Sequence, residues 1–165
     1  METAFHILSL AAQGLTIILL IAIAAHDGRH FRIRNSSVLI CLALYGIVQL
    51  ATGFPDLIGD FIAGGLLFGI GFLFWLLRGL GAGDVKLMLP LGLHIGYFGL
   101  IPFGTFLTAV SILLFAAIHL VSRTAPNSRA GGWFMDMRKN GRVPYGIVLT
   151  FAALPVLVVK FLTNL

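Results

Sequence analysis

Two aspartates stand out in a chain that carries little charge. Asp27 lies in "AAHDGRHFRIRN" and Asp84 in "GLGAGDVKLM", and each borders a strongly apolar stretch. Two carboxyls held close together cannot both ionise cheaply, so such a pair shares one proton over a wide pH range. The charged partner can take a proton from water while the neutral partner hydrogen-bonds a scissile carbonyl. This chemistry hydrolyses a peptide bond without a metal ion or a nucleophilic side chain.

The residues around Asp84 suggest how such a site would be built. Gly81 and Gly83 precede it, and the absence of a Cβ atom would let an extended substrate lie beside the carboxyl. Lys86 follows, and it either favours the charged form of Asp84 or extends towards lipid headgroups. A purely structural interpretation also stands, in which both aspartates cap helix ends or pair with Arg29 and Lys86.

Composition indicates where these residues lie. The chain has 165 residues, of which 59% are hydrophobic and 10% charged, whereas soluble domains are about 25% charged. Apolar runs of about 20 residues recur along it, as membrane-spanning helices require. The sequence therefore predicts an all-α, polytopic membrane protein, a single domain over 1–165 with a bundle of six transmembrane helices. The expected spans are 5–25, 36–54, 58–77, 87–101, 103–121 and 144–163.

The segment 87–101 is the shortest expected span, and the next span follows a break at Pro102. It either crosses the bilayer as a short, tilted helix or is re-entrant.

The basic residues indicate which loops face the cytoplasm. Ten of the eleven lysines and arginines fall in alternate connections, and only Lys160 lies elsewhere. The positive-inside rule then makes the connections 26–35, 78–86 and 122–143 cytoplasmic. This topology puts Asp27 and Asp84 at the same depth on the cytoplasmic side of a multi-pass protein of the cytoplasmic membrane. The clustering is explained by topology, so no nucleic-acid partner is expected. The ten residues are Arg29, Arg32, Arg34, Arg78, Lys86, Arg123, Arg129, Arg138, Lys139 and Arg142.

Metal and cofactor chemistry is not expected. Cys41 is the only cysteine, which excludes a disulfide framework and a thiolate zinc site. His26 and His30 flank Asp27, but no third ligand accompanies them. His94, inside an expected span, is predicted to be a hydrogen-bonded packing residue.

Two further segments suggest packing and lipid contacts. Gly65 and Gly69 form a small-xxx-small pair, which is predicted to pack inside the bundle. The segment "GGWFMDMRKNGR" mixes Trp133, Phe134 and two methionines with basic residues, as a helix lying on anionic membrane lipid does.

Three motifs resemble those of a known family. "GAGDVKLM" is similar to the G-x-G-D-x-K-L motif of the type IV prepilin peptidases, which are membrane aspartic proteases that remove the leader of pilin precursors. "DGRHFRIRN" resembles their D-x-R-x-x-x-I-P-N motif, and "VPYGIVL" (143–149) their P-F/Y-G segment. The short length and six spans are most similar to the compact branch that serves Flp/Tad pili.

The resemblance implies that Asp27 and Asp84 are the catalytic pair, that Gly81 and Gly83 shape the loop, and that prepilin precursors are the substrate. Arg34 stands where the family has proline before Asn35. The cysteine-rich zinc domain of the larger, bifunctional members is missing, so N-methylation of the new amino terminus is not assigned. The oligomeric state and the particular prepilin are not determined by these motifs.

A rival interpretation is a small ion- or proton-coupled transporter or channel in which Asp27 and Asp84 bind a cation or relay protons. Such sites usually lie near the midplane of the membrane, between repeated halves. The sequence shows no internal repeat and places both aspartates at an interface, which favours the peptidase.

Overall fold

The computed structural model describes residues 2–124, 128–140 and 143–164. The side chains at 122, 123, 129, 130, 136 and 138–140 are not described, and Arg142 lies outside the described residues, so none of the basic side chains of the 122–143 connection is described. The described part is helical and contains no strand, which confirms the predicted all-α class. Its elements are α1 (Glu2–His30), α2 (Asn35–Thr52), α3 (Leu57–Leu76), α4 (Ala82–Ile95), the 3-10 turn η1 (Tyr97–Gly99), α5 (Leu100–Thr124), α6 (Arg129–Asn140) and α7 (Tyr145–Thr163).

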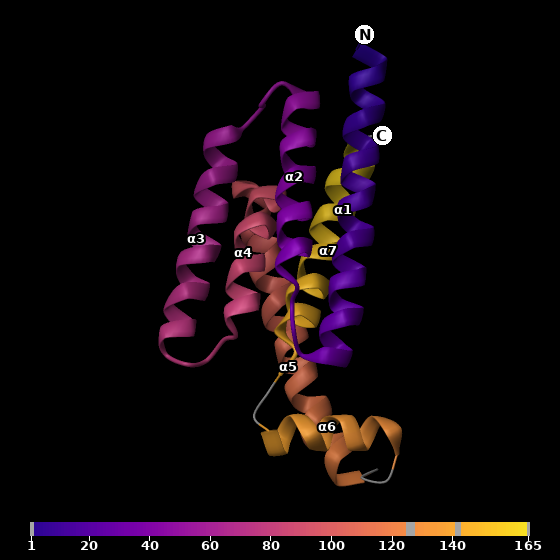
Figure 1. The fold of residues 1–165 in the computed structure, drawn as a ribbon, viewed down its shortest axis with the longest axis vertical. Helices are drawn as coiled ribbons and strands as arrows, with labels where there is room; N and C mark the ends of the chain where they lie inside the picture. Colours follow the sequence, from indigo (N-terminus) through magenta and orange to yellow (C-terminus); the bar gives the residue numbers. More distant parts are fainter. Residues whose placement is uncertain (1, 125–127, 141–142, 165) are drawn as a thin grey trace.

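Five of the described segments are long and apolar enough to cross a membrane: α1, α2, α3, α7 and the stretch Tyr97–Val121 that contains η1 and most of α5. The chain is therefore an integral membrane protein. The remaining expected span, 87–101, overlaps α4, whose 14 residues extend about 21 Å, less than the roughly 30 Å hydrocarbon core. Figure 1 shows α4 running antiparallel to both α3 and α5.

The predicted break between the fourth and fifth spans was wrong. The helix ends at Ile95, because Gly96 adopts a φ of +74°, a left-handed conformation that other residues rarely take. Pro102 instead lies in the first turn of α5. A proline is tolerated there because the first amides of a helix have no intrahelical partners.

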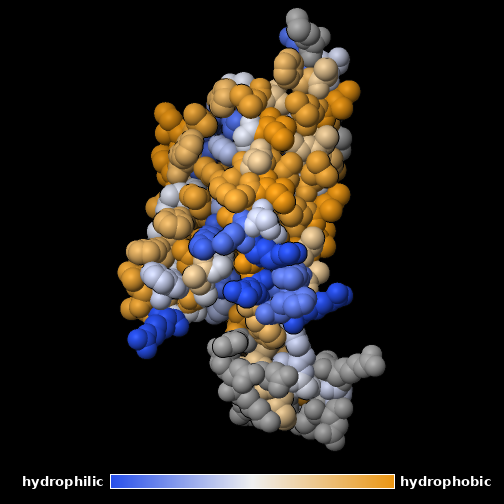
Figure 2. Space-filling view, viewed as in Figure 1, coloured by the Kyte–Doolittle hydropathy of each residue, from blue (hydrophilic) through white to orange (hydrophobic). Residues whose placement is uncertain are grey.

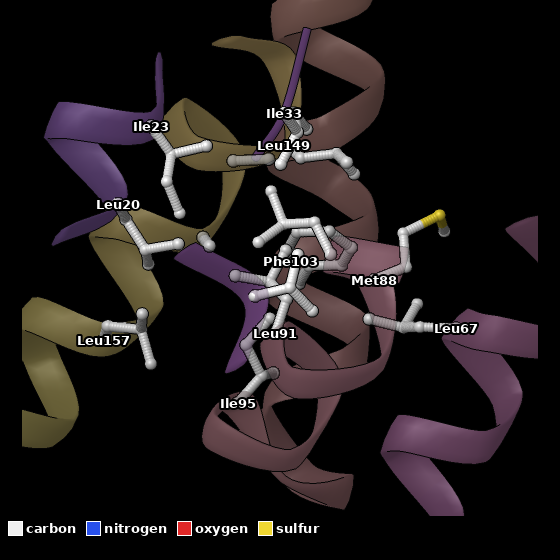
Figure 3. Close-up of a cluster of buried hydrophobic side chains, with 14 residues drawn as sticks. Leu20, Ile23, Ile33, Leu67, Met88, Leu91, Ile95, Phe103, Leu149 and Leu157 are labelled. Atoms are coloured by element: carbon white, nitrogen blue, oxygen red, sulfur yellow. The ribbon is translucent and has the colours of Figure 1, made fainter. Parts of the chain in front are cut away.

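The short helix α4 is the centre of the bundle. Ten of its 14 residues are buried, and it packs against α2, α3 and α7. Leu91 of α4 and Phe103 of α5 meet there, with Leu20 of α1 and Leu149 of α7, in the core shown in Figure 3. Because neighbouring helices enclose α4, the position of Asp84 at its start is fixed by the whole bundle.

Close packing of α3 against α4 depends on glycines, but not on the predicted pair. A Cβ atom on Gly92 would lie 2.7 Å from the carbonyl oxygen of Ala63 and from the Cα of Gly64. By contrast, a Cβ on Gly65 or Gly69 would meet nothing within 4 Å. The prediction that Gly65 and Gly69 pack inside the bundle was therefore wrong. Both the packed and the outer face of α3 are apolar, so its sequence does not distinguish them.

The two ends of the bundle differ in polarity. Figure 1 shows that α1 begins and α7 ends at one end, whereas the α1–α2 and α3–α4 connections and α6 lie at the other. In Figure 2 an apolar body carries most of its hydrophilic residues at that second end. Asp27 and Asp84, near the end of α1 and the start of α4, lie there too. The helix directions thus agree with the alternation that the basic residues predict.

We expect Gly92→Ala to reduce strongly the amount of folded protein recovered from membranes, because its Cβ would collide with the backbone of α3. Gly65→Ala, the matched control in open space, should be recovered as well as wild type. Size-exclusion profiles in detergent measure both. Equal recovery of the two variants would contradict the packing of α3 against α4.

Candidate active site

Asp27 lies near the C-terminal end of α1 with only 3% of its surface exposed. Its Oδ2 atom accepts a hydrogen bond of 2.9 Å from the backbone amide of Gly146, in the first turn of α7. Amides in this position lack intrahelical partners and lie at the positive end of the helix dipole, so they favour a carboxylate.

The Pro-Tyr-Gly motif explains how α1 and α7 come close to each other. Pro144 is the N-cap residue of α7, and a Cβ on Gly146 would lie 2.7 Å from Asp27 Oδ2. Only glycine leaves room for the carboxylate at this position. The motif resemblance of the Pro-Tyr-Gly segment predicted no role for Gly146. A glycine two residues after a helix-starting proline was the signal that could have identified it.

Asp84 lies in the first turn of α4 and is 8% exposed. Its Oδ2 atom accepts a hydrogen bond of 3.2 Å from the amide of Gly81, the N-cap residue. A Cβ on Gly81 would lie 2.8 Å from that oxygen. Gly81 thus makes room for the carboxyl itself.

Gly83 makes room for another part of the chain. A Cβ there would lie 3.3 Å from Ile33 Cβ and 3.6 Å from Ile33 N, in the α1–α2 connection. Gly81 has an ordinary φ of −75°, and Gly83 lies within α4. They let parts of the protein itself pack closely around the carboxyl. Both glycines also line the cavity that holds Asp84, so the expected path for substrate beside the carboxyl stays a prediction.

Asp27 and Asp84 line the same cavity, which has a volume of about 1200 Å³ at the polar end of the bundle. Cations surround it: Arg32, Arg34, Arg78 and Lys86 belong to its lining, with His26 and His30. The expected convergence of the first and second aspartate motifs is thus present in the fold.

Lys86 and the two histidines have structural partners in this lining. Lys86 Nζ donates a hydrogen bond of 3.2 Å to Asn35 Oδ1, which links α4 to the start of α2. The rings of His26 and His30 stack with 4.2 Å between their centroids. Among the described residues, no group of three histidine, cysteine or acidic side chains could hold a metal ion.

The two carboxyls influence each other's ionisation. Asp84 precedes the apolar part of α4, outside the five candidate spans. Burial, together with the nearby Asp27 carboxylate, raises the pKa of Asp84 to about 7. Asp27 exerts this effect only when it is charged, so ionisation of one carboxyl disfavours ionisation of the other. Both aspartates accept a hydrogen bond from the amide of a helix start, which confirms that they cap helices. Each uses its Oδ2 atom for this contact, so Oδ1 stays available for chemistry.

The helix α6 contacts the protein beside Asp27. Trp133 Nε1 donates a hydrogen bond of 3.0 Å to the carbonyl oxygen of Gly28, and Met137 is only 2% exposed. The segment predicted to lie on the membrane surface, α6, therefore packs some of its apolar side chains against the end of the bundle.

The fold and this cavity define a polytopic membrane protein with two carboxyls facing one polar cavity at one end. The chain matches the family model described as the type IV leader peptidase family over residues 14–120, and it belongs to that family. The matched range contains Asp27 and Asp84 and ends before the Pro-Tyr-Gly segment. Neither the curated proteins nor the solved structures gave a match to this chain.

We expect two substitutions of Asp27 to differ in stability. Asparagine can still accept the Gly146 hydrogen bond and removes a buried charge, so Asp27→Asn should unfold at or above the wild-type temperature. Asp27→Ala leaves that amide without a hydrogen-bond acceptor, so its free energy of unfolding should be about 1 to 2 kcal/mol lower. Thermal unfolding in detergent measures this difference. Equal midpoints for the two variants would show that the hydrogen bond does not hold α1 to α7.

Proposed function

We propose that this chain is an aspartic endopeptidase that removes the leader peptide of type IV, Flp-like prepilins. The supporting observation is the pair formed by Asp27 and Asp84, which come from separate helices to line one cavity. The family is one of leader peptidases, and burial beside Asp27 raises the pKa of Asp84 to about 7.

The pair suits general acid–base hydrolysis. Charged Asp27 takes a proton from a water molecule, whose oxygen attacks the scissile carbonyl, while Asp84 donates its proton to the carbonyl oxygen. When the tetrahedral intermediate collapses, Asp27 passes its proton to the departing amine and Asp84 recovers a proton from the intermediate. The sum is the addition of one water molecule across the peptide bond, and both carboxyls return to their starting states.

The hydrogen bonds described above would keep the pair oriented during this cycle. Gly146 and Gly81 each donate to an Oδ2 atom, which fixes the direction of both carboxyl planes. A rigid frame of this kind is what a catalytic pair needs, because small displacements of reacting groups cost large factors in rate.

We further propose that the cavity faces the cytoplasm, because its lining and the adjacent connections carry Arg32, Arg34, Arg78 and Lys86. A prepilin would then present its leader from the cytoplasm while its apolar segment stays in the membrane. Transport remains the weaker hypothesis, since both aspartates lie at the end of the bundle and not at its centre, where transporters bind ions.

Co-expression with an Flp-type prepilin, scored by loss of the leader on a gel, tests the proposal. Asp27→Asn and Asp84→Asn should each lower the cleavage rate by about 10² to 10⁴, the usual contribution of one acid–base group. Both variants should remain in the membrane, since asparagine keeps the helix-capping oxygen.

Glu2→Gln is the matched control, because it removes a carboxyl at the opposite end of the bundle and should cleave like wild type. A chelator should have no effect. Cleavage that is stopped by EDTA and restored by zinc would contradict the aspartic mechanism, and wild-type cleavage by either aspartate variant would contradict the assigned residues.

A further inference from the structure

A second polar cluster lies at the opposite end of the bundle from the catalytic pair. Asp60, at the start of α3, is only 4% exposed. Its Oδ2 atom accepts hydrogen bonds from Tyr45 Oη at 2.9 Å and from Gln49 Nε2 at 2.5 Å, both on α2. A buried carboxyl with two donors on one oxygen marks a region that apolar packing alone does not explain.

Lys160 brings a cation to the same place. Its Nζ atom donates a hydrogen bond of 3.0 Å to the carbonyl oxygen of His94, at the end of α4. A Cβ on the adjacent Gly96 would lie 2.8 Å from Asp60 Oδ1 and 3.8 Å from Lys160 Nζ. The carboxyl of α3 and the ammonium of α7 therefore both lie beside the turn that ends α4. Lys160 is also the one basic residue that the topology did not explain.

Gln49 supplies an unsatisfied acceptor. It is 5% exposed, and its Oε1 atom is the one buried side-chain nitrogen or oxygen in the described part of the chain without a hydrogen-bond partner. The orientation of this amide follows from its neighbour, because the carboxyl oxygen of Asp60 receives the Nε2 donor. A buried acceptor without a donor is costly, so this atom is suited to a ligand that carries N–H or O–H groups.

Gln49, Asp60 and Lys160 line one cavity of about 640 Å³. The polar part of its lining also includes Asp56 and the uncharged side chains of Gln13, Thr52, Thr163 and Asn164, and its apolar part includes Phe98, Phe106, Val156 and Val159. The lining contains two carboxyls, those of Asp56 and Asp60, and one ammonium, that of Lys160, so its carboxyls outnumber its cations. A cavity that combines such a polar part with an apolar part matches an amphiphile whose headgroup carries a cationic donor.

We propose that this cavity binds a phospholipid whose headgroup carries a primary ammonium, such as phosphatidylethanolamine. The ammonium lies against Gln49 Oε1 and Asp60, the phosphate lies near Lys160, and the acyl chains follow the apolar wall. A bare metal ion fits less well because Lys160 stands in the same cavity. The site is independent of the proposed peptidase activity.

The test compares two lipids that differ only in the donors of the headgroup. Protein purified in detergent is titrated with dioleoyl-phosphatidylethanolamine or with dioleoyl-phosphatidylcholine, and bound lipid is counted by native mass spectrometry. The ethanolamine lipid should bind about tenfold more tightly, as expected for one hydrogen bond to a charged group. Equal binding of the two lipids would overturn the proposal, and so would equally tight binding of soluble phosphoethanolamine, which lacks acyl chains.

Variants locate the site. Gln49→Leu and Lys160→Gln should each remove the preference for the ethanolamine lipid, whereas Glu2→Gln, a charge change at the same end but outside this cavity, should keep it. Retention of the full preference in both cavity variants would overturn the assignment of the site. Because the readout is bound lipid, it does not depend on whether prepilin is cleaved.

Discussion

The hydrogen bond between the Gly146 amide and Asp27 joins the first long helix to the last, and the polar end of the bundle is arranged around it. A carboxyl near the C-terminal end of α1 would be unfavourable if it met only the negative end of that helix dipole. The first turn of α7 supplies the compensating amide, and Gly146 provides the space. The same contact orients one carboxyl of the candidate pair. In wild type, this one carboxyl both holds α1 to α7 and belongs to the candidate pair. Asp27→Asn separates the two roles, because asparagine keeps the hydrogen bond and cannot act as an acid or a base.

The short helix α4 imposes a second constraint. It is buried among its neighbours, and each of its two ends brings polar groups into the bundle. Its first turn places Asp84 in the cavity with Asp27. Its end at Gly96 brings Asp60 of α3 and Lys160 of α7 to one turn. A longer helix in this position would have carried its end past the buried Asp60 and separated these groups.

The sequence predicted the all-α membrane class well, because that class follows from composition. The convergence of Asp27 and Asp84 could be predicted because topology places both at one end. Which glycines pack could not be predicted: α3 is apolar on its lipid face and on its packed face, so Gly65 and Gly64 look alike in sequence. The role of Gly146 was missed for a related reason, since it depends on a contact between residues 119 positions apart. The break at Gly96 depends on its positive φ, which the sequence does not show. Pro102 was the more obvious helix breaker, so the break was predicted there.

Infrared titration of the carboxyl groups tests the coupled pair most directly. The difference between spectra of wild type and Asp84→Asn isolates the C=O band of protonated Asp84, and its loss with rising pH gives the pKa. We predict a midpoint of about 7 in wild type. In Asp27→Asn, which removes the neighbouring charge, the midpoint should move to lower pH. A midpoint near 4 in wild type, or one that Asp27→Asn leaves unchanged, would contradict the shared proton on which the proposed mechanism depends.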